Sequence, residues 1–351
     1  MGSVKRLWMA RGRMALLALA VGALLCAWSL RPPTASALAP RDPTPTVTIP
    51  ATATDTVTPS ATAAIFPPAG VTAPPAPTLT AKAAELYDLT TGQTLLSLAP
   101  DTSLPMASTT KIMTAVVALT YGNLNQEITV GPDAYAIEFD GTSIAGLNLG
   151  EKLTLKELLY CLMLPSGDDA AVAIADGIAG SQERFVALMN LEAALLGLGH
   201  THYANPHGLD QPGHYTSASD LIRLTAFALQ SPTFAQIVQT PKITLPATAT
   251  HHTFHLDNTN NLLPGLPFAY SGAIGVKTGY TGGAGYCLVF LVRRPAGTLL
   301  GVVLGEPVEN ERFTNATSML NWGYALLSPT PTPTATSAAS PTAAPTASAT
   351  P

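Results

Sequence analysis

Charged residues are scarce in this sequence. Only 11% of the 351 residues are charged, 47% are hydrophobic, and the formal net charge is −5. A chain without a broad basic field is poorly suited to electrostatic binding of nucleic acid, whereas a small or neutral substrate is easier to accept. The hydrophobic content is sufficient for a substantial core, so we expect a globular protein with a sparsely charged surface.

Cysteine is equally rare, with three residues in the whole chain. Cys26 lies in an N-terminal apolar run that we expect to be removed, which leaves Cys161 and Cys287. Two cysteines cannot form a disulfide framework, so the fold must be stabilised by its core. Each of the two lies in an apolar stretch and is predicted to be a buried thiol. A single bridge between them is the alternative.

The N-terminus has the pattern of an export signal. Basic residues between Lys5 and Arg13 precede an uncharged apolar run at 14–30, which is short for a membrane span. Small residues at 35, 37 and 39 have the spacing that signal peptidase cleaves. Residues 1–38 are therefore predicted to be an export signal, with an uncleaved anchor as the alternative; Cys26 is not expected to carry a lipid, because Leu25 stands where a small residue should precede it. The predicted location is extracytoplasmic, in the cell envelope or secreted.

Two segments of low complexity enclose one domain. Residues 39–78 are dominated by Pro, Thr and Ala, and residues 328–351 by Pro, Thr, Ser and Ala. Such compositions bury too little apolar surface to fold, so both are predicted to be a disordered linker and tail. Residues 79–327 have the length of one large domain and contain no internal repeat.

The order of secondary structure in that domain predicts an α+β fold. Short β-type runs form expected hairpins at 83–89 with 93–98 and at 285–293 with 298–305. The middle is helical, with Pro-free segments expected at 111–119, 155–164, 170–179, 182–196 and 219–229. A helical block between strands at both ends of the domain means that distant segments complete the sheet.

Ser108 and Lys111 form the first candidate catalytic pair. They precede a segment, 112–119, that is apolar on nearly every side and must be a buried helix. Residues three apart share a helix face, so the lysine amine can reach the serine hydroxyl. A desolvated lysine can remove the proton of a serine nucleophile, and a helix N-terminus favours the negative charge that develops there. Alone, this pattern is far more often an N-cap serine with a chance lysine than a catalytic pair.

Two further motifs follow in the chain. Ser166, Gly167 and Asp168 lie in a turn between two apolar helices, where Ser166 could point into a cleft. Lys277, Thr278 and Gly279 lie just before the predicted strand at 285–293, with glycines that allow close approach of a substrate backbone. Three weak motifs in this order are far less expected by chance than any one of them.

Together the motifs resemble those of the penicillin-recognising serine enzymes: serine-x-x-lysine, serine-x-asparagine and lysine-threonine-glycine. Further segments are similar to the low-molecular-mass D-alanyl-D-alanine carboxypeptidases, the branch that includes penicillin-binding protein 5. These segments are 107–115, Gly150-Glu151, 157–159, 205–209, 258–260 and 277–281. The resemblance covers 79–327, without the β-rich C-terminal domain of many relatives. It implies an antiparallel sheet flanked by helices with an inserted all-helical subdomain, as in serine β-lactamases and DD-peptidases.

The resemblance also implies a mechanism and a substrate. Ser108 would attack a peptidoglycan stem peptide ending in D-Ala-D-Ala, Lys111 would take its proton, and β-lactams would trap the acyl-enzyme. Backbone N–H groups of Ser108 and Tyr280 would hold the oxyanion. Ser166 would relay a proton to the leaving D-alanine. Lys277 and Thr278, with Gly279 beside them, would receive the terminal carboxylate. No cofactor or metal is implied.

Asp168 departs from the family pattern, which has asparagine at that position. An ionised aspartate only accepts hydrogen bonds, whereas an asparagine amide also donates. Asp168 should hold Lys111 protonated, which opposes its role as a base. Activity is therefore expected to be reduced or shifted in pH, or retained with Asp168 protonated.

Four other functions fit parts of the sequence. A zinc hydrolase could use His200, His202, His207 and His214, although no His-Glu-x-x-His pattern is present. A β-lactamase would need a glutamate-bearing loop, and none is evident. A D,D-endopeptidase of cross-links is not separated from a carboxypeptidase by sequence. A penicillin- or wall-binding protein without turnover would follow if Asp168 impairs catalysis.

Overall fold

The computed structural model describes residues 74–137 and 141–328. The predicted export signal, nearly all of the two low-complexity segments and the run at 14–30 lie outside these residues. The limits of the four predicted regions therefore stay predictions. Within the described ranges, no helix is long and apolar enough to cross a membrane.

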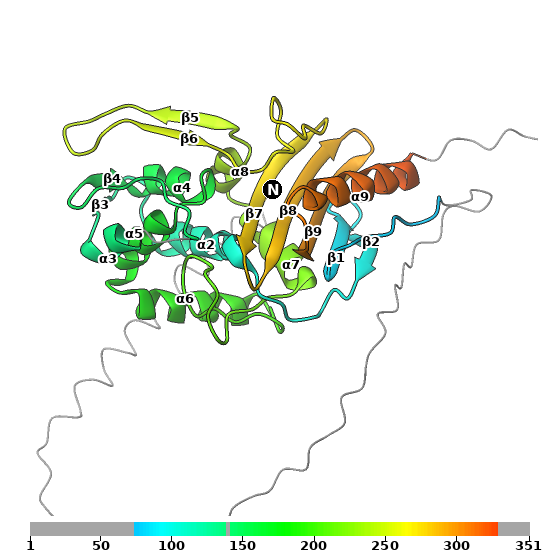
Figure 1. Cartoon of the computed structure of the whole chain (residues 1–351), viewed down its shortest axis with the longest axis horizontal. Helices are drawn as coiled ribbons and strands as arrows, with labels where there is room; N and C mark the ends of the chain where they lie inside the picture. The colour runs from blue at the N-terminus through cyan, green and yellow to red at the C-terminus, as the bar shows by residue number, and fades with distance from the viewer. Residues whose placement is uncertain (1–73, 138–140, 329–351) are drawn as a thin grey trace, which may run out of the picture.

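A five-stranded antiparallel sheet forms one half of the domain (Figure 1). Its order is β2 (Gln93–Leu98), β1 (Ala83–Asp88), β9 (Gly297–Glu306), β8 (Gly285–Arg294) and β7 (Ala273–Thr281). The first strand pairs with the last, with Leu86 opposite Gly301. Distant segments thus complete the sheet, as the order of predicted elements required.

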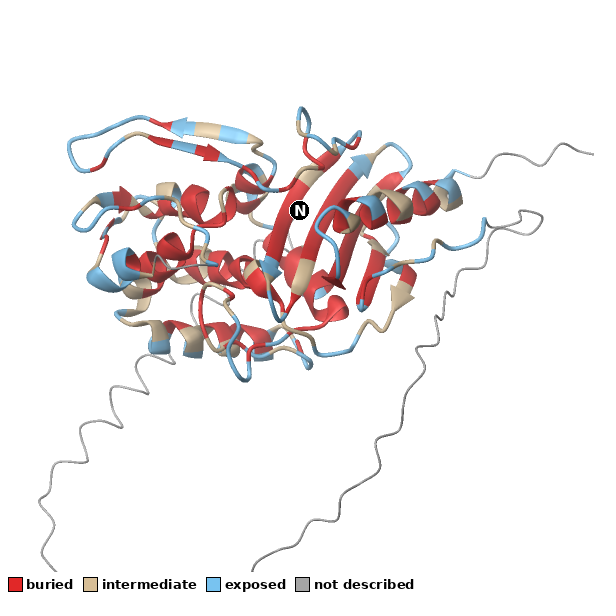
Figure 2. Ribbon diagram, in the orientation of Figure 1, coloured by how far each residue is buried: buried red, intermediate tan, exposed pale blue. Residues whose placement is uncertain are grey.

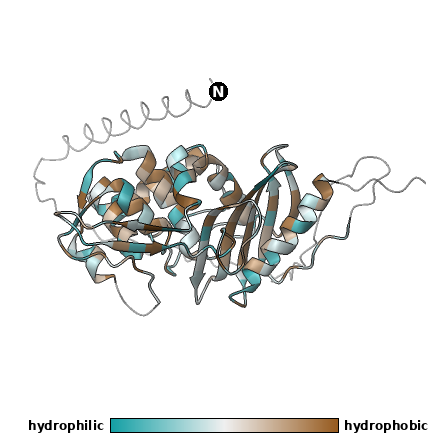
Figure 3. Ribbon diagram, turned by 90° about the horizontal axis from the view of Figure 1, so that it is seen from above, coloured by the Kyte–Doolittle hydropathy of each residue, from teal (hydrophilic) through white to brown (hydrophobic). Residues whose placement is uncertain are grey.

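Apolar side chains alternate between the two faces of the sheet, so both faces are covered. On β8, Leu288 and Phe290 pack towards helix α9 (Glu311–Leu327), whereas Cys287 and Val289 belong to the core on the opposite face. Helices α7 (Ala218–Ala228) and α8 (Pro232–Val238) contact that opposite face. Figure 2 shows the strands as an almost continuous buried layer, and Figure 3 shows their hydrophobic character from above.

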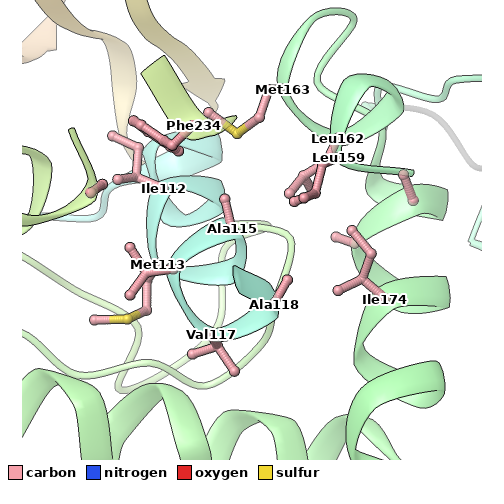
Figure 4. Close-up of a cluster of buried hydrophobic side chains, with 14 of the residues drawn as sticks. Ile112, Met113, Ala115, Val117, Ala118, Leu159, Leu162, Met163, Ile174 and Phe234 are labelled. Carbon is pink, nitrogen blue, oxygen red and sulfur yellow. The ribbon is translucent and has the colours of Figure 1, made fainter. Parts of the chain in front are cut away.

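The second half of the domain is a helical subdomain built around α2. It contains α2 (Lys111–Tyr121), α3 (Pro132–Ala136), α4 (Leu155–Met163), α5 (Asp168–Ala179) and α6 (Gln182–Leu195). Eight consecutive residues of α2 are buried, because α4, α5, α6 and α7 surround it. Figure 4 shows Ile112, Ala115 and Ala118 of α2 among apolar side chains of its neighbours. A helix that is apolar on all sides requires this central position.

Two small antiparallel sheets complete the fold. β3 (Glu127–Thr129) pairs with β4 (Lys152–Thr154) within the helical subdomain, which is therefore not purely helical. β5 (Lys242–Leu245) pairs with β6 (Phe254–Asp257) in a long hairpin beyond α8. Neither sheet was predicted.

The five predicted helices and four predicted strands agree with the structure to within about two residues at either end. Strand β7 was not predicted. The motif at 277–279 was expected just before a strand, and it lies inside β7. Cys161 and Cys287 are buried free thiols, as predicted, and the alternative of a bridge between them is wrong. Burial raises the pKa of the Cys287 thiol to about 11.

Candidate active site

The nucleophile candidate lies where the sheet meets the helical subdomain. Ser108 belongs to a short 3-10 helix, η1 (Ala107–Thr110), that leads directly into α2. Ser108 is partly exposed, while its neighbours Ala107 and Thr109 are buried. Lys111, the first residue of α2, donates from Nζ to Ser108 Oγ at 2.8 Å. The predicted contact of amine and hydroxyl is therefore present.

Lys111 is completely buried and held from three sides. Besides Ser108, its Nζ donates to Asp168 Oδ1 at 2.5 Å and to the His207 backbone oxygen at 2.7 Å. Burial lowers the pKa of Lys111, while the negative charge of Asp168 acts against this effect and raises it. The net direction is downward, which makes an unprotonated amine more accessible than in an exposed lysine.

Ser166 and Asp168 enter the site from the turn between α4 and α5. Ser166 has φ of 70°, an uncommon conformation for a residue with a side chain, and its Oγ is buried without a hydrogen-bond partner in the described residues. Uncommon backbone conformations of this kind concentrate at functional sites. Asp168 accepts from the Ser143 N–H through Oδ2, at 3.2 Å. Its two carboxylate oxygens therefore have different partners.

Asp169 was missed by the sequence reasoning. Its carboxylate accepts hydrogen bonds from the backbone N–H groups of Ala145, Gly146 and Leu147, at 2.9 to 3.1 Å. It thereby fixes the loop that also supplies Ser143 to Asp168. Two consecutive aspartates at a helix start are a signal for such caps, but the sequence does not tell which loop they bind.

The motif at 277–279 lines the site from the edge strand β7. Lys277 is 1% exposed and donates from Nζ to the Thr278 oxygen at 3.1 Å. Burial lowers its pKa well below the ordinary value, and the charge of Lys111 lowers it further. The Thr278 hydroxyl lies 2.6 Å from the Thr259 hydroxyl, so two hydroxyl groups stand beside the strand. Thr259 lies in the segment 258–260, which resembles the family but was given no role by the sequence analysis.

Two glycines allow the segment of Ser108 to pack against backbone. A Cβ on Gly279 would lie 3.0 Å from the Ala107 Cβ and 3.1 Å from the Ser108 nitrogen. Gly208 has φ of 105°, and a Cβ there would lie 2.1 Å from the Ala107 oxygen. The distance at Gly208 leaves no room for a Cβ, and the distances at Gly279 would require a shift of a few tenths of an ångström, so both glycines contribute to the position of Ser108.

Tyr280 and Arg312 lie at the end of β7. The Tyr280 ring is about half exposed and stacks on Tyr286 of β8, with ring centroids 4.2 Å apart. Arg312, at the start of α9, donates to the Gly279 backbone oxygen at 3.3 Å and is 7% exposed. Its guanidinium is the only arginine group bonded to the motif strand within the described ranges. The sequence reasoning did not identify Arg312, because it is 33 residues from the motif.

The histidines considered as zinc ligands have other partners. His214 accepts the Ala204 N–H at Nδ1, so its Nε2 carries the proton and donates to Thr110 Oγ1 at 2.8 Å. Thr110 in turn donates to the Ala107 oxygen. Burial lowers the pKa of His214 to about 4, so it is neutral at neutral pH. In the described parts of the chain, no group of three His, Cys, Asp or Glu residues could hold a metal ion.

The sequence and the structure both have close relatives. A family model described as D-alanyl-D-alanine carboxypeptidase, Peptidase S11, matches residues 70–308. This chain belongs to that family. A D-alanyl-D-alanine carboxypeptidase of Streptomyces strain K15 is 38% identical over 73% of this chain and 91% of its own length. One of Bacillus subtilis is 37% identical over 70% of this chain and 62% of its own.

The solved structure of the Streptomyces K15 DD-transpeptidase superposes with a TM-score of 0.66. It is 37% identical over 72% of this chain and 99% of that one. The predicted family, the predicted α+β fold and the predicted serine-type D-Ala-D-Ala peptidase class are thus confirmed. The chain spans less than two thirds of the length of the Bacillus subtilis carboxypeptidase. The same holds for a similar carboxypeptidase of Escherichia coli.

Proposed function

We propose that the chain is a serine D-alanyl-D-alanine carboxypeptidase that removes the terminal D-alanine of peptidoglycan stem peptides through an acyl-enzyme on Ser108. The observation that carries this proposal is the contact of the buried Lys111 Nζ with Oγ of the partly exposed Ser108, at 2.8 Å. A weak nucleophile requires a base in hydrogen-bond reach, and the lowered pKa of Lys111 suits that role.

Acylation begins when unprotonated Lys111 takes the Ser108 proton and Oγ attacks the carbonyl carbon of the penultimate D-alanine. The oxyanion accepts hydrogen bonds from the N–H groups of Ser108 and Tyr280, which belong to η1 and β7. Gly279 lets these two elements approach closely, since a Cβ there would lie 3.0 Å from the Ala107 Cβ and 3.1 Å from the Ser108 nitrogen. The geometry of the oxyanion site thus depends on packing between a helix turn and an edge strand.

Ser166 relays the proton that Lys111 took from Ser108 to the nitrogen of the departing D-alanine, so that Lys111 is again unprotonated and Ser166 again carries its own proton. Its buried, unpartnered Oγ supports this role, because a hydroxyl with no partner in the described chain is available to the substrate. Water then hydrolyses the ester, and Ser108 and Lys111 return to their starting states. A β-lactam acylates the same oxygen and blocks this last step.

The terminal carboxylate of the substrate binds beside β7. Lys277 supplies a buried amine that can donate hydrogen bonds, and Thr278 supplies a hydroxyl with Thr259 as its neighbour. Arg312 adds a cation whose Nε has no partner among the described residues. A carboxylate receptor of this composition favours an exopeptidase, since an internal peptide bond has no free carboxylate to place there.

Action on peptidoglycan requires export, so the location proposed is extracytoplasmic. The basic residues and apolar run at the N-terminus support this, although they lie outside the described residues. The partners proposed are stem peptides ending in D-Ala-D-Ala and β-lactams.

The experiment is incubation of the purified protein and of Ser108→Ala with diacetyl-L-lysyl-D-alanyl-D-alanine, with D-alanine release and penicillin adduct mass measured on the same samples. Release together with an adduct on Ser108 supports the proposal. Residual labelling in Ser108→Ala contradicts the choice of nucleophile. An adduct without release supports instead an endopeptidase or a binding protein weakened by Asp168.

Transfer to an amine is a second candidate, since the similar Streptomyces K15 structure is that of a DD-transpeptidase. Adding glycylglycine to the same assay separates the two activities, because transfer yields a lengthened peptide and hydrolysis does not.

A further inference from the structure

A second concave surface lies at the opposite edge of the five-stranded sheet from β7. Two adjoining cavities of about 480 and 380 Å³ share Glu85, Thr94, Ser219 and Arg223. The strands β1 and β2 form one wall, and α7 forms the other. Each volume is in the range of about 300–1,000 Å³ that is typical of small-molecule sites.

Glu85 is the unusual residue of this groove. It lies on β1 opposite Val302 of β9, on the face of the sheet that carries the larger core, and its side chain is 6% exposed. Its Oε1 accepts from the Thr94 hydroxyl at 2.9 Å. Its Oε2 is buried and has no hydrogen-bond partner in the residues that the structure describes. Buried carboxylate oxygens are normally paired, so this one lacks a donor.

The neighbouring charges do not supply that donor. Arg223 directs its Nη1 to Asp220 Oδ1 at 2.8 Å, and its side chain is half exposed. Asp101, which lines the smaller cavity, adds a second negative charge near Glu85. Burial, together with Asp101, raises the pKa of Glu85. A cation next to Oε2 would supply the missing hydrogen-bond donor and would offset the negative charge of Asp101.

One part of the groove is apolar, while Gln230, Ser97 and Asp101 add polar groups at its other parts. Tyr87, Leu196, Ile222 and Phe227 line the larger cavity around the carboxylate. A divalent metal would need several oxygen ligands, and no cluster of three His, Cys, Asp or Glu residues is found in the described chain. The surroundings fit one donor group attached to an apolar body.

We propose that this Glu85 groove, lined by Glu85, Tyr87, Thr94, Ser219, Ile222 and Arg223, binds a small primary ammonium compound with an apolar body. The ammonium donates to Glu85 Oε2, and the body packs against Ile222 of α7 and Tyr87 of β1. Two strands, β9 and β8, separate β1 from the motif strand β7, so the ligand does not touch Ser108. The groove is therefore a site distinct from the one that receives the substrate carboxylate.

The rim of the Glu85 groove is nevertheless linked along the chain to the segment of Ser108. Pro100 and Asp101 line the smaller cavity, and the chain runs from them directly to η1. Ser219 of α7 holds this segment, since its N–H donates to the Pro100 oxygen at 3.0 Å and its hydroxyl donates to Asp101 at 2.5 Å.

The test uses benzylamine as the probe, with the full chain and ligand-observed NMR titration. Binding to the protein is expected, and benzyl alcohol, which has the same shape without the charge, should bind at least tenfold more weakly. Glu85→Gln should weaken benzylamine binding at least tenfold. Glu183→Gln, an exposed carboxylate on α6, is the matched control and should leave it unchanged. Penicillin labelling of Ser108 verifies that each variant is folded.

Ala226→Leu provides a second variant, because it narrows the groove from α7 without altering the carboxylate. It should also weaken benzylamine binding, with labelling intact. Unchanged affinity in Glu85→Gln, or no benzylamine binding to the original protein, would overturn the proposal and leave water as the partner of Glu85. Loss of binding after penicillin acylation would overturn it too, since the probe would then occupy the active site.

Discussion

Replacement of Asp168 by asparagine tests the electrostatics of Lys111, the proposed base. Asp168 Oδ1 lies 2.5 Å from Lys111 Nζ, and both side chains are almost fully buried. At an effective dielectric constant of about 20, unit charges about 4 Å apart attract by about 4 kcal/mol. Each pKa unit corresponds to about 1.4 kcal/mol, so this attraction strongly favours protonated Lys111.

An asparagine removes the charge but keeps a hydrogen bond, so only part of that energy is lost. The pKa of Lys111 is already lowered by burial and should fall further in Asp168→Asn. In the proposed mechanism, activity requires the unprotonated amine and is lost as the pH falls through the pKa of Lys111. The acid limb of the rate profile should therefore move by about 1–3 pH units to lower pH, the range found for close charge pairs.

The assay is penicillin acylation rate and D-alanine release against pH, for the original protein and the variant. On the acid limb, Asp168→Asn should be about tenfold faster for each pH unit of displacement. Glu183→Gln is the control, since it removes one negative charge from an exposed position on α6 and leaves the contacts of Lys111 intact. An acid limb that stays in place, or moves to higher pH, would refute the electrostatic argument.

Three further predictions concern neighbouring groups. Arg312→Ala should raise KM about tenfold for a peptide with a free terminal carboxylate, which corresponds to a loss of about 1.4 kcal/mol in binding free energy, and should change KM little for the corresponding peptide amide. An equal rise in KM for both peptides would contradict a carboxylate receptor. Asp169→Asn should lower the free energy of unfolding by about 1–3 kcal/mol, because the backbone N–H groups of the loop at 145–147 lose one of the two oxygen atoms that accept from them. An unchanged melting temperature would show that other contacts hold this loop in place. Gly208→Ala should lower the free energy of unfolding by at least about 1–3 kcal/mol and slow acylation of Ser108, because a Cβ would meet the Ala107 oxygen. Penicillin labelling at the rate of the original protein would exclude a role of Gly208 in placing Ser108.

Much of the fold could be predicted because local patterns and packing agree. The segment at 112–119 is apolar on all sides, and α2 is indeed the helix that its neighbours surround. The hairpin 83–89 with 93–98 is bounded by a clear turn and appears as β1 and β2. In contrast, β7 contains glycines and buried polar residues, so it lacks the alternation by which a strand is recognised.

The sequence by itself determined the family, the order of the motifs and the pair Ser108 and Lys111. The family follows from the resemblance of the motifs, and the pair follows from its spacing, because residues three apart lie on one side of a helical turn. It also identified Asp168 as the departure from the family pattern.

The tertiary structure decided what depends on contacts between distant segments. It joined Arg312 to Gly279, Asp169 to the loop at 145–147, and His214 to Thr110. It also buried Glu85 without a donor, a property that depends on how α7 packs on β1. No spacing rule predicts such contacts, because burial and unmet hydrogen bonds arise only when the helices close over the sheet.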